Sequence, residues 1–412
     1  MESSSSSSAT PQSQGKLAHR ARTLAPSATL ATVAKVRRMQ AEGVEIFDLT
    51  AGEPDFPPPP AAEAAGIAAI EQGKGRYTAA AGMMPLRKAV AAQLKRNWDL
   101  PYQPQEVVIT NGAKIAIAQA LLALVDPGDE VLIPIPCWTS YPEMVKLAAG
   151  VPVEVPCLSN HLPDMTALEA ARTERTVAIL LNTPSNPTGV VYPEDCLREL
   201  GEWALRHGIR VISDEIYAAM TYGEAKHVSP LALLPELRKT SVWIGGMSKT
   251  YAMTGWRMGF LAAAPEVAKA VATVQSQLSG SPNAITQLAS LAAIEQADAD
   301  VARMVQAFAA RAKLMSEKLS AMPGIRCELP QGAFYAWLDV SAFFGRLDPA
   351  TQRTVESGDD LADILLEADG VASIGGSAFG DSRCLRFSFA AGEEVLTEAM
   401  HRVAARLAAL QP

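Results

Sequence analysis

Short apolar runs and amphipathic stretches alternate along the middle of the chain. The apolar runs predict strands at 107–110, 131–135, 151–155, 177–182, 210–213 and 241–244. The stretches around them predict helices at 61–72, 84–97, 113–125, 138–149 and 193–207. Strands that alternate with helices are typical of a mostly parallel sheet covered on both faces. The sequence therefore predicts an α/β fold, in which ligands bind at the carboxyl ends of the strands.

The two ends of the chain follow other patterns. Residues 1–15 are rich in serine and predict a disordered tail. Beyond residue 260 we expect mainly helix to about 322, a strand pair within 332–340, a helix at 359–369, strands at 371–374 and 384–389, and a last helix from 393. This predicts a large domain over 61–305 and a smaller α+β domain over 306–412, joined by the N-terminal segment 16–60.

Composition narrows the class of protein. Of 412 residues, 49% are hydrophobic and 19% charged, which is typical of a packed globular protein, and the net charge of -8 argues against a nucleic-acid partner. The five cysteines are far apart and favour neither a zinc site nor a disulfide framework, which fits a reducing cytoplasm. No apolar run is long enough for a membrane span or a signal peptide.

A lysine follows the last predicted strand of the central series. Lys249 comes after Gly245 and Gly246, where the strand at 241–244 ends. A lysine held in such a place and shielded from water has a lowered pKa, and its neutral amine can attack a carbonyl. The alternative is an ordinary solvated loop lysine, so Lys249 needs partners before it indicates chemistry.

An anion site is predicted where the strand at 107–110 runs into a helix. Gly112, Ala113 and Lys114 open that helix, and free N–H groups at a helix start suit a phosphate. Arg257, eight residues after Lys249, is a candidate second ligand. Alone each signal is weak, because many strand-to-helix turns carry glycine and most arginines are surface residues.

Four more polar or aromatic residues lie at strand ends or inside a strand. Asn186 is held between two prolines after the strand at 177–182, and Asp214 ends an apolar strand, where an ionised carboxylate needs a cation. Trp138 follows the strand at 131–135 and could stack on a flat ring. Arg386, between apolar neighbours, suits bidentate capture of a carboxylate. The alternatives are that Asn186 only caps a turn, that Trp138 is a core residue and that Arg386 forms a structural ion pair.

These residues together describe one ligand. It has a phosphate, an aromatic ring with a cationic nitrogen and a carbonyl that meets a lysine, and it lies beside a substrate carboxylate. That combination predicts pyridoxal 5'-phosphate and an amino acid. No metal ion is expected.

Several motifs carry a resemblance to a known family. They are Ser-Ala-Thr-Leu-Ala (27–31), Thr-Ala-Gly-Glu-Pro-Asp-Phe (50–56), Asn-Pro-Thr-Gly (186–189), Ser-Asp-Glu-Ile-Tyr (213–217), Ser-Lys-Thr-Tyr-Ala-Met-Thr-Gly-Trp-Arg (248–257) and Leu-Arg-Phe-Ser (385–388). The chain resembles fold-type-I, class I/II aminotransferases, similar to bacterial aspartate aminotransferase-like enzymes. The resemblance implies a mostly parallel seven-stranded sheet, a homodimer with shared active sites, and pyridoxal phosphate as cofactor.

The resemblance also implies roles for single residues. Lys249 would be the Schiff-base lysine and proton carrier, Asp214 would pair with the ring nitrogen, and Asn186 and Tyr217 would bind the phenolic oxygen. The phosphate would contact Gly112, Ala113, Lys114, Ser248, Arg257 and, from the second subunit, Tyr77, while Trp138 would stack on the ring. The substrate carboxylate would bind Arg386, with Gly52, Trp138 and Asn186 nearby.

The chain departs from the family pattern at two positions. Gly246 stands where many members have a serine or threonine, and Ser248 would replace that contact. Relatives that use aspartate or prephenate tend to have a lysine where this chain has Ala25, and the helix after Lys114 offers no second cation, so the amino donor stays open. We expect transamination between an L-amino acid and a 2-oxo acid. The alternatives are elimination, replacement or ring formation on the same fold, or a non-catalytic binding module.

Overall fold

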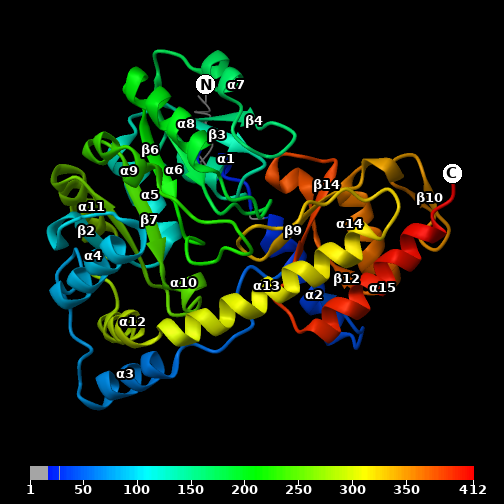
Figure 1. Ribbon diagram of the computed structural model, residues 1–412, viewed down its shortest axis with the longest axis horizontal. Coiled ribbons are helices and arrows are strands. Elements are labelled where there is room, and N and C mark those ends of the chain that lie inside the picture. The colour runs from blue at the N-terminus through cyan, green and yellow to red at the C-terminus, as the bar shows by residue number, and fades with distance from the viewer. Residues whose placement is uncertain (1–16, 27) are drawn as a thin grey trace, which may run out of the picture.

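The computed structural model describes residues 17–26 and 28–412. The tail expected at 1–15 lies outside the described residues. Figure 1 shows two bodies side by side, one built on a large twisted sheet and the other on a small sheet with its own helices. The long helix α13 (Asp298–Ser320) runs from the first body to the second.

Within the described residues, seven strands form the large sheet in the order β2–β8–β7–β6–β5–β3–β4. Their bounds are β2 Val107–Thr110, β3 Glu130–Ile135, β4 Val151–Pro156, β5 Thr176–Asn182, β6 Arg210–Asp214, β7 Val242–Gly246 and β8 Gly259–Ala263. Neighbours pair in parallel except at β8, which is antiparallel to both β2 and β7. The predicted α/β class and mostly parallel sheet are confirmed.

Strand β8 is absent from the sequence prediction, which placed helix beyond residue 260. The run Gly-Phe-Leu-Ala-Ala at 259–263 is buried throughout and lies between β2 and β7. A short apolar run that is buried on both sides has no alternation, so periodicity cannot separate strand from helix. Helix begins only at α11 (Pro265–Leu278).

Both faces of the large sheet are covered by helices. Along β5, Ile179 and Leu181 face one core and Ala178 and Leu180 the other, as the two-residue period of a strand requires. The first core is covered by α4 (Met84–Trp98), α8 (Glu194–His207) and α12 (Ala284–Gln296), and α12 packs in turn against α3 (Pro60–Glu71). The second core is covered by α5 (Ala113–Leu124), α6 (Tyr141–Leu147) and α11. Helix α6 is shorter than the predicted 138–149, so Trp138 lies in the turn before it.

Local sequence explains where these helices begin and end. Helix α8 starts after Pro193 with two acidic residues in its first turn and ends with Arg206 and His207 in its last, which complements the helix dipole. Gly208 then takes a left-handed conformation with φ 67°, which stops the helix.

The second body is built on a small antiparallel sheet in the order β13–β14–β9. Its strands are β9 Tyr335–Asp339, β13 Ile374–Gly375 and β14 Cys384–Ser388, packed with α14 (Gly358–Asp369) and α15 (Glu393–Ala409). The strand pair predicted within 332–340 is wrong: this segment holds one strand, and its partner is β14. Strand pairing depends on distant residues that local pattern does not identify.

The N-terminal segment lies against the C-terminal body. Strand β1 (Phe47–Asp48) pairs in parallel with β12 (Val371–Ala372), and Lys35 of α2 (Ala28–Ala41) forms ion pairs with Asp363 and Glu367 of α14. Figure 1 shows α2 beside α14 and α15, at the opposite end of the colour scale. The exact domain limits 16–60, 61–305 and 306–412 stay a prediction.

Shorter elements complete the described chain. They are the helices α1 His19–Thr23, α7 Met165–Ala171, α9 Pro230–Leu233 and α10 Met247–Thr250, the strands β10 Leu347–Asp348 and β11 Arg353–Thr354, and the 3-10 turns η1 Pro104–Glu106, η2 Pro235–Lys239, η3 Ser341–Phe343 and η4 Gly376–Phe379.

Candidate active site

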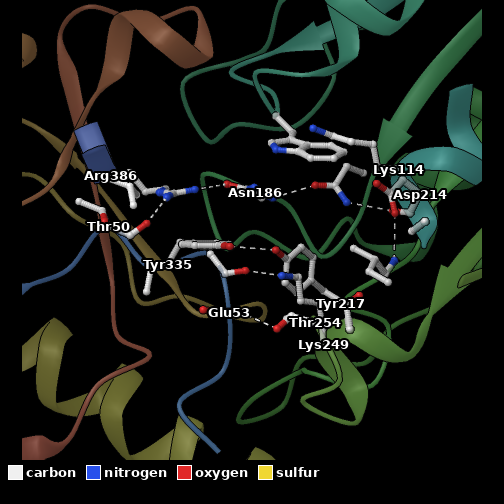
Figure 2. Close-up of a pocket in the computed structure, with 18 of the residues that line it drawn as sticks. Thr50, Glu53, Lys114, Asn186, Asp214, Tyr217, Lys249, Thr254, Tyr335 and Arg386 are labelled. Carbon is white, nitrogen blue, oxygen red and sulfur yellow. Dashed lines mark hydrogen bonds between the residues drawn. The ribbon is translucent and has the colours of Figure 1, made fainter. Parts of the chain in front are cut away.

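A cavity of about 580 Å³ lies at the carboxyl ends of the parallel strands. The N-terminal segment and the small sheet close it from the other side (Figure 2). Eleven of the residues singled out in the sequence line it: Gly52, Ala113, Lys114, Trp138, Asn186, Asp214, Tyr217, Ser248, Lys249, Arg257 and Arg386. The structure therefore brings together residues that are spread over more than three hundred positions.

Lys249 lies on the single turn of α10, directly after β7. A Cβ at Gly246 would come within 3.0 Å of the Gly259 backbone, so glycine lets β7 pack closely against β8 and fixes the position from which α10 starts. The Lys249 Nζ donates a hydrogen bond to the Gly52 carbonyl oxygen and lies 5.6 Å from the centre of the Phe334 ring.

The surroundings of Lys249 favour its neutral amine. Burial lowers the pKa of Lys249 to about 8; the charges of Arg386 and Arg257 act in the same direction, and Glu53 and Asp214 oppose them. An amine with a pKa near 8 is a nucleophile and a proton carrier at neutral pH, which a solvated lysine is not. The interpretation of Lys249 as an ordinary loop lysine is therefore disfavoured.

Asp214 is the last residue of β6 and is 2% exposed. Its Oδ2 accepts a hydrogen bond of 2.7 Å from the Tyr141 hydroxyl, and its Oδ1 accepts one of 3.1 Å from the Ile216 N–H. Burial raises the pKa of Asp214 to about 6, although both hydrogen bonds lower it. A carboxylate in this position gains from a cation placed beside it in the cavity.

A chain of hydrogen bonds leads from β6 to Arg386 on β14. The Asn182 side chain donates to the Asp214 carbonyl oxygen at 2.9 Å and accepts from the Asn186 N–H at 2.8 Å. Arg386 Nη1 donates to Asn186 Oδ1 at 2.9 Å, and its Nη2 donates to the Thr50 carbonyl oxygen at 3.0 Å (Figure 2). Asn186 is thus fixed at both its backbone and its side chain.

Arg386 is 3% exposed and has donors to spare. Its guanidinium lies 4.3 Å from the centre of the Tyr335 ring and 5.0 Å from that of Phe379, and its buried Nε has no hydrogen-bond partner among the described residues. Burial lowers the pKa of Arg386 below its usual value. No carboxylate pairs with it in the described chain, so the predicted alternative of a structural ion pair is not what the structure shows. The geometry suits a ligand carboxylate.

Tyr217 joins the two bodies of the molecule. Its hydroxyl lies 2.9 Å from that of Tyr335 on β9, and the two rings meet edge to face at 6.0 Å. Both tyrosines are buried, and burial raises the pKa of each hydroxyl, so each keeps its proton. One hydroxyl donates to the other, which leaves one of the two protons for an oxygen in the cavity.

Positive charge gathers at the N-terminus of α5. Gly112 precedes the helix with φ 98°, and a Cβ there would meet Arg257 Nη2 at 2.6 Å, so glycine lets the guanidinium approach the helix start. The Lys114 Nζ lies 4.9 Å from the centre of the Trp138 ring, and burial together with the Arg257 charge lowers the pKa of Lys114. Two cations and free backbone N–H groups at one helix start favour an anion.

Gly112, which precedes α5, is not itself among the residues that line this cavity, and neither is Tyr77. Its side chain is 97% exposed and does not line the cavity of its own chain. Its predicted role in a second subunit stays a prediction, as do the individual roles of the other residues.

Sequence reasoning missed several residues that line the cavity. Tyr141 could have been found, because it lies one helical turn after Trp138. Thr50 and Glu53 flank the predicted Gly52, but their contacts with Arg386 and Thr254 cross between distant segments. Tyr335 gave no signal, since an aromatic residue in a strand is usually part of a core.

Two further features of the described residues concern metal ions and membranes. None of their His, Cys, Asp and Glu side chains form a group of three or more that could hold a metal ion. None of their helices is long and apolar enough to cross a membrane.

The set of donors and acceptors fits pyridoxal phosphate. The start of α5, Arg257 and Lys114 suit the phosphate, the Trp138 ring offers a flat surface, and the buried Asp214 carboxylate suits a ring nitrogen that carries a proton. Lys249 supplies an amine in the same cavity, and Arg386 uses only one N–H of each Nη within the chain, which leaves the other N–H of each for the carboxylate of a substrate.

Comparisons with known proteins agree with this choice of cofactor. The family model "Aminotransferase class I and II" matches residues 44–403. The chain is 41% identical to the aspartate aminotransferase of Geobacillus stearothermophilus, over 94% of this chain and 98% of that one. It is 40% identical to the aspartate aminotransferase of Streptomyces avermitilis, over 96% and 98% of the two chains.

Solved structures show the same fold. The aspartate aminotransferase of Rhizobium meliloti superposes with a TM-score of 0.93 at 36% identity, covering 96% of this chain and 100% of that one. The aspartate aminotransferase of Thermus thermophilus with maleate superposes with a TM-score of 0.89 at 38% identity, covering 95% of this chain and 100% of that one. These relatives transfer amino groups, so elimination, replacement or ring formation is not favoured. The chain belongs to the class I and II aminotransferase family and is a pyridoxal-phosphate-dependent aminotransferase of fold type I.

Proposed function

We propose that the enzyme transfers the amino group of an L-amino acid to a 2-oxo acid, with Lys249 as the residue that holds the cofactor and carries the proton. The names of the relatives favour aspartate as the amino donor. The observation that carries this proposal is the Lys249 amine, whose pKa burial lowers to about 8, in one cavity with Asp214 and Arg386.

Different residues around the cavity would bind different parts of the cofactor. The start of α5, Lys114, Ser248 and Arg257 would hold the phosphate, and Asp214 would keep the proton on the ring nitrogen. Asn186 and Tyr217 would donate to the phenolic oxygen, and Trp138 would cover one face of the ring. When bound, pyridoxal phosphate supplies an electron sink for the pair of electrons left when the amino acid Cα loses its proton.

Arg386 would orient the substrate. Its free N–H groups bind the α-carboxylate, while Asn186 and the Thr50 carbonyl hold the guanidinium from behind. Binding of the α-carboxylate places the Cα of the substrate near the Lys249 Nζ. The neutral amine then takes the proton from that Cα as a general base. In the structure, the Lys249 Nζ donates a hydrogen bond to the Gly52 carbonyl oxygen.

We also propose that the enzyme works as a homodimer with shared sites. Tyr77 is almost fully exposed, and Ile67, Ile70 and Leu278 expose large apolar side chains as well. Exposed apolar residues of this size favour burial against another copy of the chain, where Tyr77 would contact the phosphate of the partner. The five free cysteines fit a reducing compartment, and we propose the cytoplasm.

Isotope transfer tests the proposed reaction. Holoenzyme is incubated with 15N-labelled L-amino acids and 2-oxoglutarate, and the label is followed by mass spectrometry. Transfer predicts 15N in the glutamate that forms, whereas elimination would release it as ammonium. Lys249→Ala should abolish both the transfer and the visible absorbance of the lysine-bound cofactor. Lys269→Ala, an exposed lysine on α11, is the matched control and should retain both. Transfer that survives Lys249→Ala would refute the assignment.

A further inference from the structure

A second carboxylate, which the proposed reaction does not use, lies directly behind Asp214. Ser213 and Glu215 flank Asp214 in the chain, so at the end of β6 their side chains point to the face opposite the Asp214 carboxylate. The Ser213 hydroxyl donates to Glu215 Oε1 at 2.8 Å, as two side chains on the same face can. The Glu215 side chain is 0% exposed and does not line the cavity. Glu215 therefore faces neither the ligand nor solvent.

Four donors surround the Glu215 carboxylate. In addition to Ser213, the Ser229 hydroxyl donates to Oε1 at 2.7 Å. The Trp243 Nε1–H donates to Oε2 at 2.6 Å, and His227 Nε2 lies 2.7 Å from the same oxygen. A buried carboxylate that accepts several hydrogen bonds is stabilised in its charged form. The donor set therefore favours an ionised Glu215.

The His227 ring does not neutralise this charge. Its Nε2 faces the carboxylate, whereas its Nδ1 is buried and has no hydrogen-bond partner in the part of the chain that the structure describes. A charged ring would carry a hydrogen on both nitrogens, and the one on Nδ1 would be a buried donor without an acceptor. The geometry therefore favours a neutral ring with its hydrogen on Nε2. Within residues 17–26 and 28–412, no lysine or arginine forms an ion pair with Glu215.

The charge on the far face of β6 acts on Asp214. Only the backbone separates the two neighbouring side chains, and both are buried, so water and salt screen their interaction weakly. Burial is the largest cause of the raised pKa of Asp214, the Glu215 charge acts in the same direction, and the hydrogen bonds from Tyr141 and Ile216 oppose them. The same charge would also stabilise a proton on a ring nitrogen beside Asp214.

Other titratable groups near the two carboxylates do not cancel this effect. Lys249 acts on Asp214 from the cavity side, and Arg238 of η2 lies on the far side, where it acts on the same buried tyrosine as Glu215 does. The remaining groups are tyrosines whose pKa burial raises, so that they stay uncharged: Tyr102, Tyr141 and Tyr217.

We propose that Glu215 is a positioning residue that acts through Asp214: its buried charge makes Asp214 and the ring nitrogen beside it hold their shared proton more tightly. Pyridoxal phosphate is a stronger electron sink when its ring nitrogen is protonated, so the far face of β6 would assist transfer without touching the cofactor. The donors also fix the end of β6, because Trp243 belongs to β7 and Ser229 precedes α9. This inference rests on the proposed pairing of Asp214 with the ring nitrogen.

Removing the charge of Glu215 while keeping its size tests the proposal. In Glu215→Gln, the Ser213 and Ser229 hydroxyls can turn and accept from the new amide. Holoenzyme is dialysed to equilibrium at a series of values between about pH 5 and 8, and the retained cofactor is measured by its absorbance. The midpoint of cofactor loss follows the pKa of Asp214, which is about 6. It should fall by about half a pH unit or more in Glu215→Gln, because Asp214 then ionises more readily.

Three further variants separate the charge from packing. Glu215→Asp keeps a carboxylate on a shorter side chain, and Ser229→Ala removes one donor. Both should lower the temperature of thermal unfolding and move the pH midpoint by less than about 0.2 of a unit. Glu215→Ser is a second neutral variant, with room for a water between the donors, and should show the same fall as Glu215→Gln. Either neutral variant that folds therefore decides the question.

A purely structural role for Glu215 predicts lower thermal stability in all these variants and no movement of the midpoint. An unmoved midpoint in a folded neutral variant, or equal movement in Glu215→Asp and Glu215→Gln, would overturn the proposal. Asp214→Asn distinguishes this result from a failure of the proposed site, because it should remove the pH dependence of cofactor retention altogether. If Asp214→Asn keeps the wild-type midpoint, the pairing of Asp214 with the ring nitrogen is itself wrong.

Discussion

Asp214 and Glu215 are neighbours in sequence but have different surroundings. Glu215 is buried on the far side of β6, where Ser213, Ser229 and Trp243 donate to it at 2.8, 2.7 and 2.6 Å and the His227 ring lies at 2.7 Å. The Asp214 carboxylate accepts only from Tyr141 and Ile216 among the described residues and borders the cavity. The carboxylate that is left partly unsatisfied is the one available to a ligand.

The pH dependence of cofactor binding should follow Asp214. Its pKa is raised to about 6, so the carboxyl is ionised above that pH and protonated below it. Because the ionised form attracts a protonated ring nitrogen, affinity for pyridoxal phosphate should weaken as the pH falls through about 6. Tyr141→Phe removes a hydrogen bond that stabilises the carboxylate and should move this midpoint upward by about one pH unit. Fluorescence titration of the apoenzyme measures it, and an unmoved midpoint would contradict the role of Tyr141.

Sequence reasoning found the residues whose chemistry is unusual for their position. Lys249, Asn186, Asp214 and Arg386 are polar groups at strand ends or within an apolar strand, and burying them is costly without a partner. It did not find Thr50 or Tyr335, because a backbone carbonyl and a core tyrosine are ordinary until distant segments fold against them. It also could not tell which side of β6 faces the cavity, which depends on what packs on each face.

At the scale of elements, the start of α5 depends on two glycines. A Cβ at Gly259 would meet the Ala113 nitrogen at 2.4 Å, and one at Gly112 would meet Arg257. Strand β8 thus runs close under the turn that presents the helix N-terminus. The sequence predicted that turn, because glycine before a helix is a recognisable signal. It missed β8, because a short buried run carries no period.

Gly112→Ala should weaken cofactor binding. The residue has φ 98°, so alanine costs about 1 kcal/mol of stability, and its Cβ also displaces Arg257 from the helix start. Affinity for pyridoxal phosphate should fall about tenfold.

Gly280→Ala is the matched control. Gly280 also has positive φ, at 73°, but no atom lies within 4 Å of a Cβ built there. This variant should lose similar stability in thermal unfolding and keep its affinity for the cofactor. Equal affinities in the two variants would show that the space beside Arg257 does not matter.

At the scale of the whole molecule, the cavity is assembled from both bodies and closed by the N-terminal segment. Tyr217 on one body meets Tyr335 on the other, and Glu53 of the segment accepts from Thr254. The alternation of strands and helices predicted the first body well. The second was harder to predict, because β9, β13 and β14 pair across long stretches of sequence and β1 pairs with β12 more than three hundred residues away.

Subunit complementation tests whether Tyr77 acts across the dimer. Tyr77→Ala and Lys249→Ala homodimers should both be poorly active, the second completely inactive. Co-expressed with two different affinity tags, they form heterodimers in which one site has both Lys249 and the partner's Tyr77 intact. These heterodimers should therefore regain about half of the wild-type kcat per dimer. If Tyr77 acts on its own chain, no site is complete and activity should not return.

The position of Arg386 on β14 has a consequence for how the enzyme is made. All residues proposed to hold the cofactor from within one chain lie between Gly112 and Arg257, and β8 completes the large sheet at Ala263. Arg386 leaves the ribosome more than a hundred residues later, and the Thr50 carbonyl has no guanidinium to hold until then. During synthesis the cofactor side of the cavity is therefore complete before the substrate side, and a nascent chain cannot bind an amino acid until β14, the last strand of the described chain, has emerged.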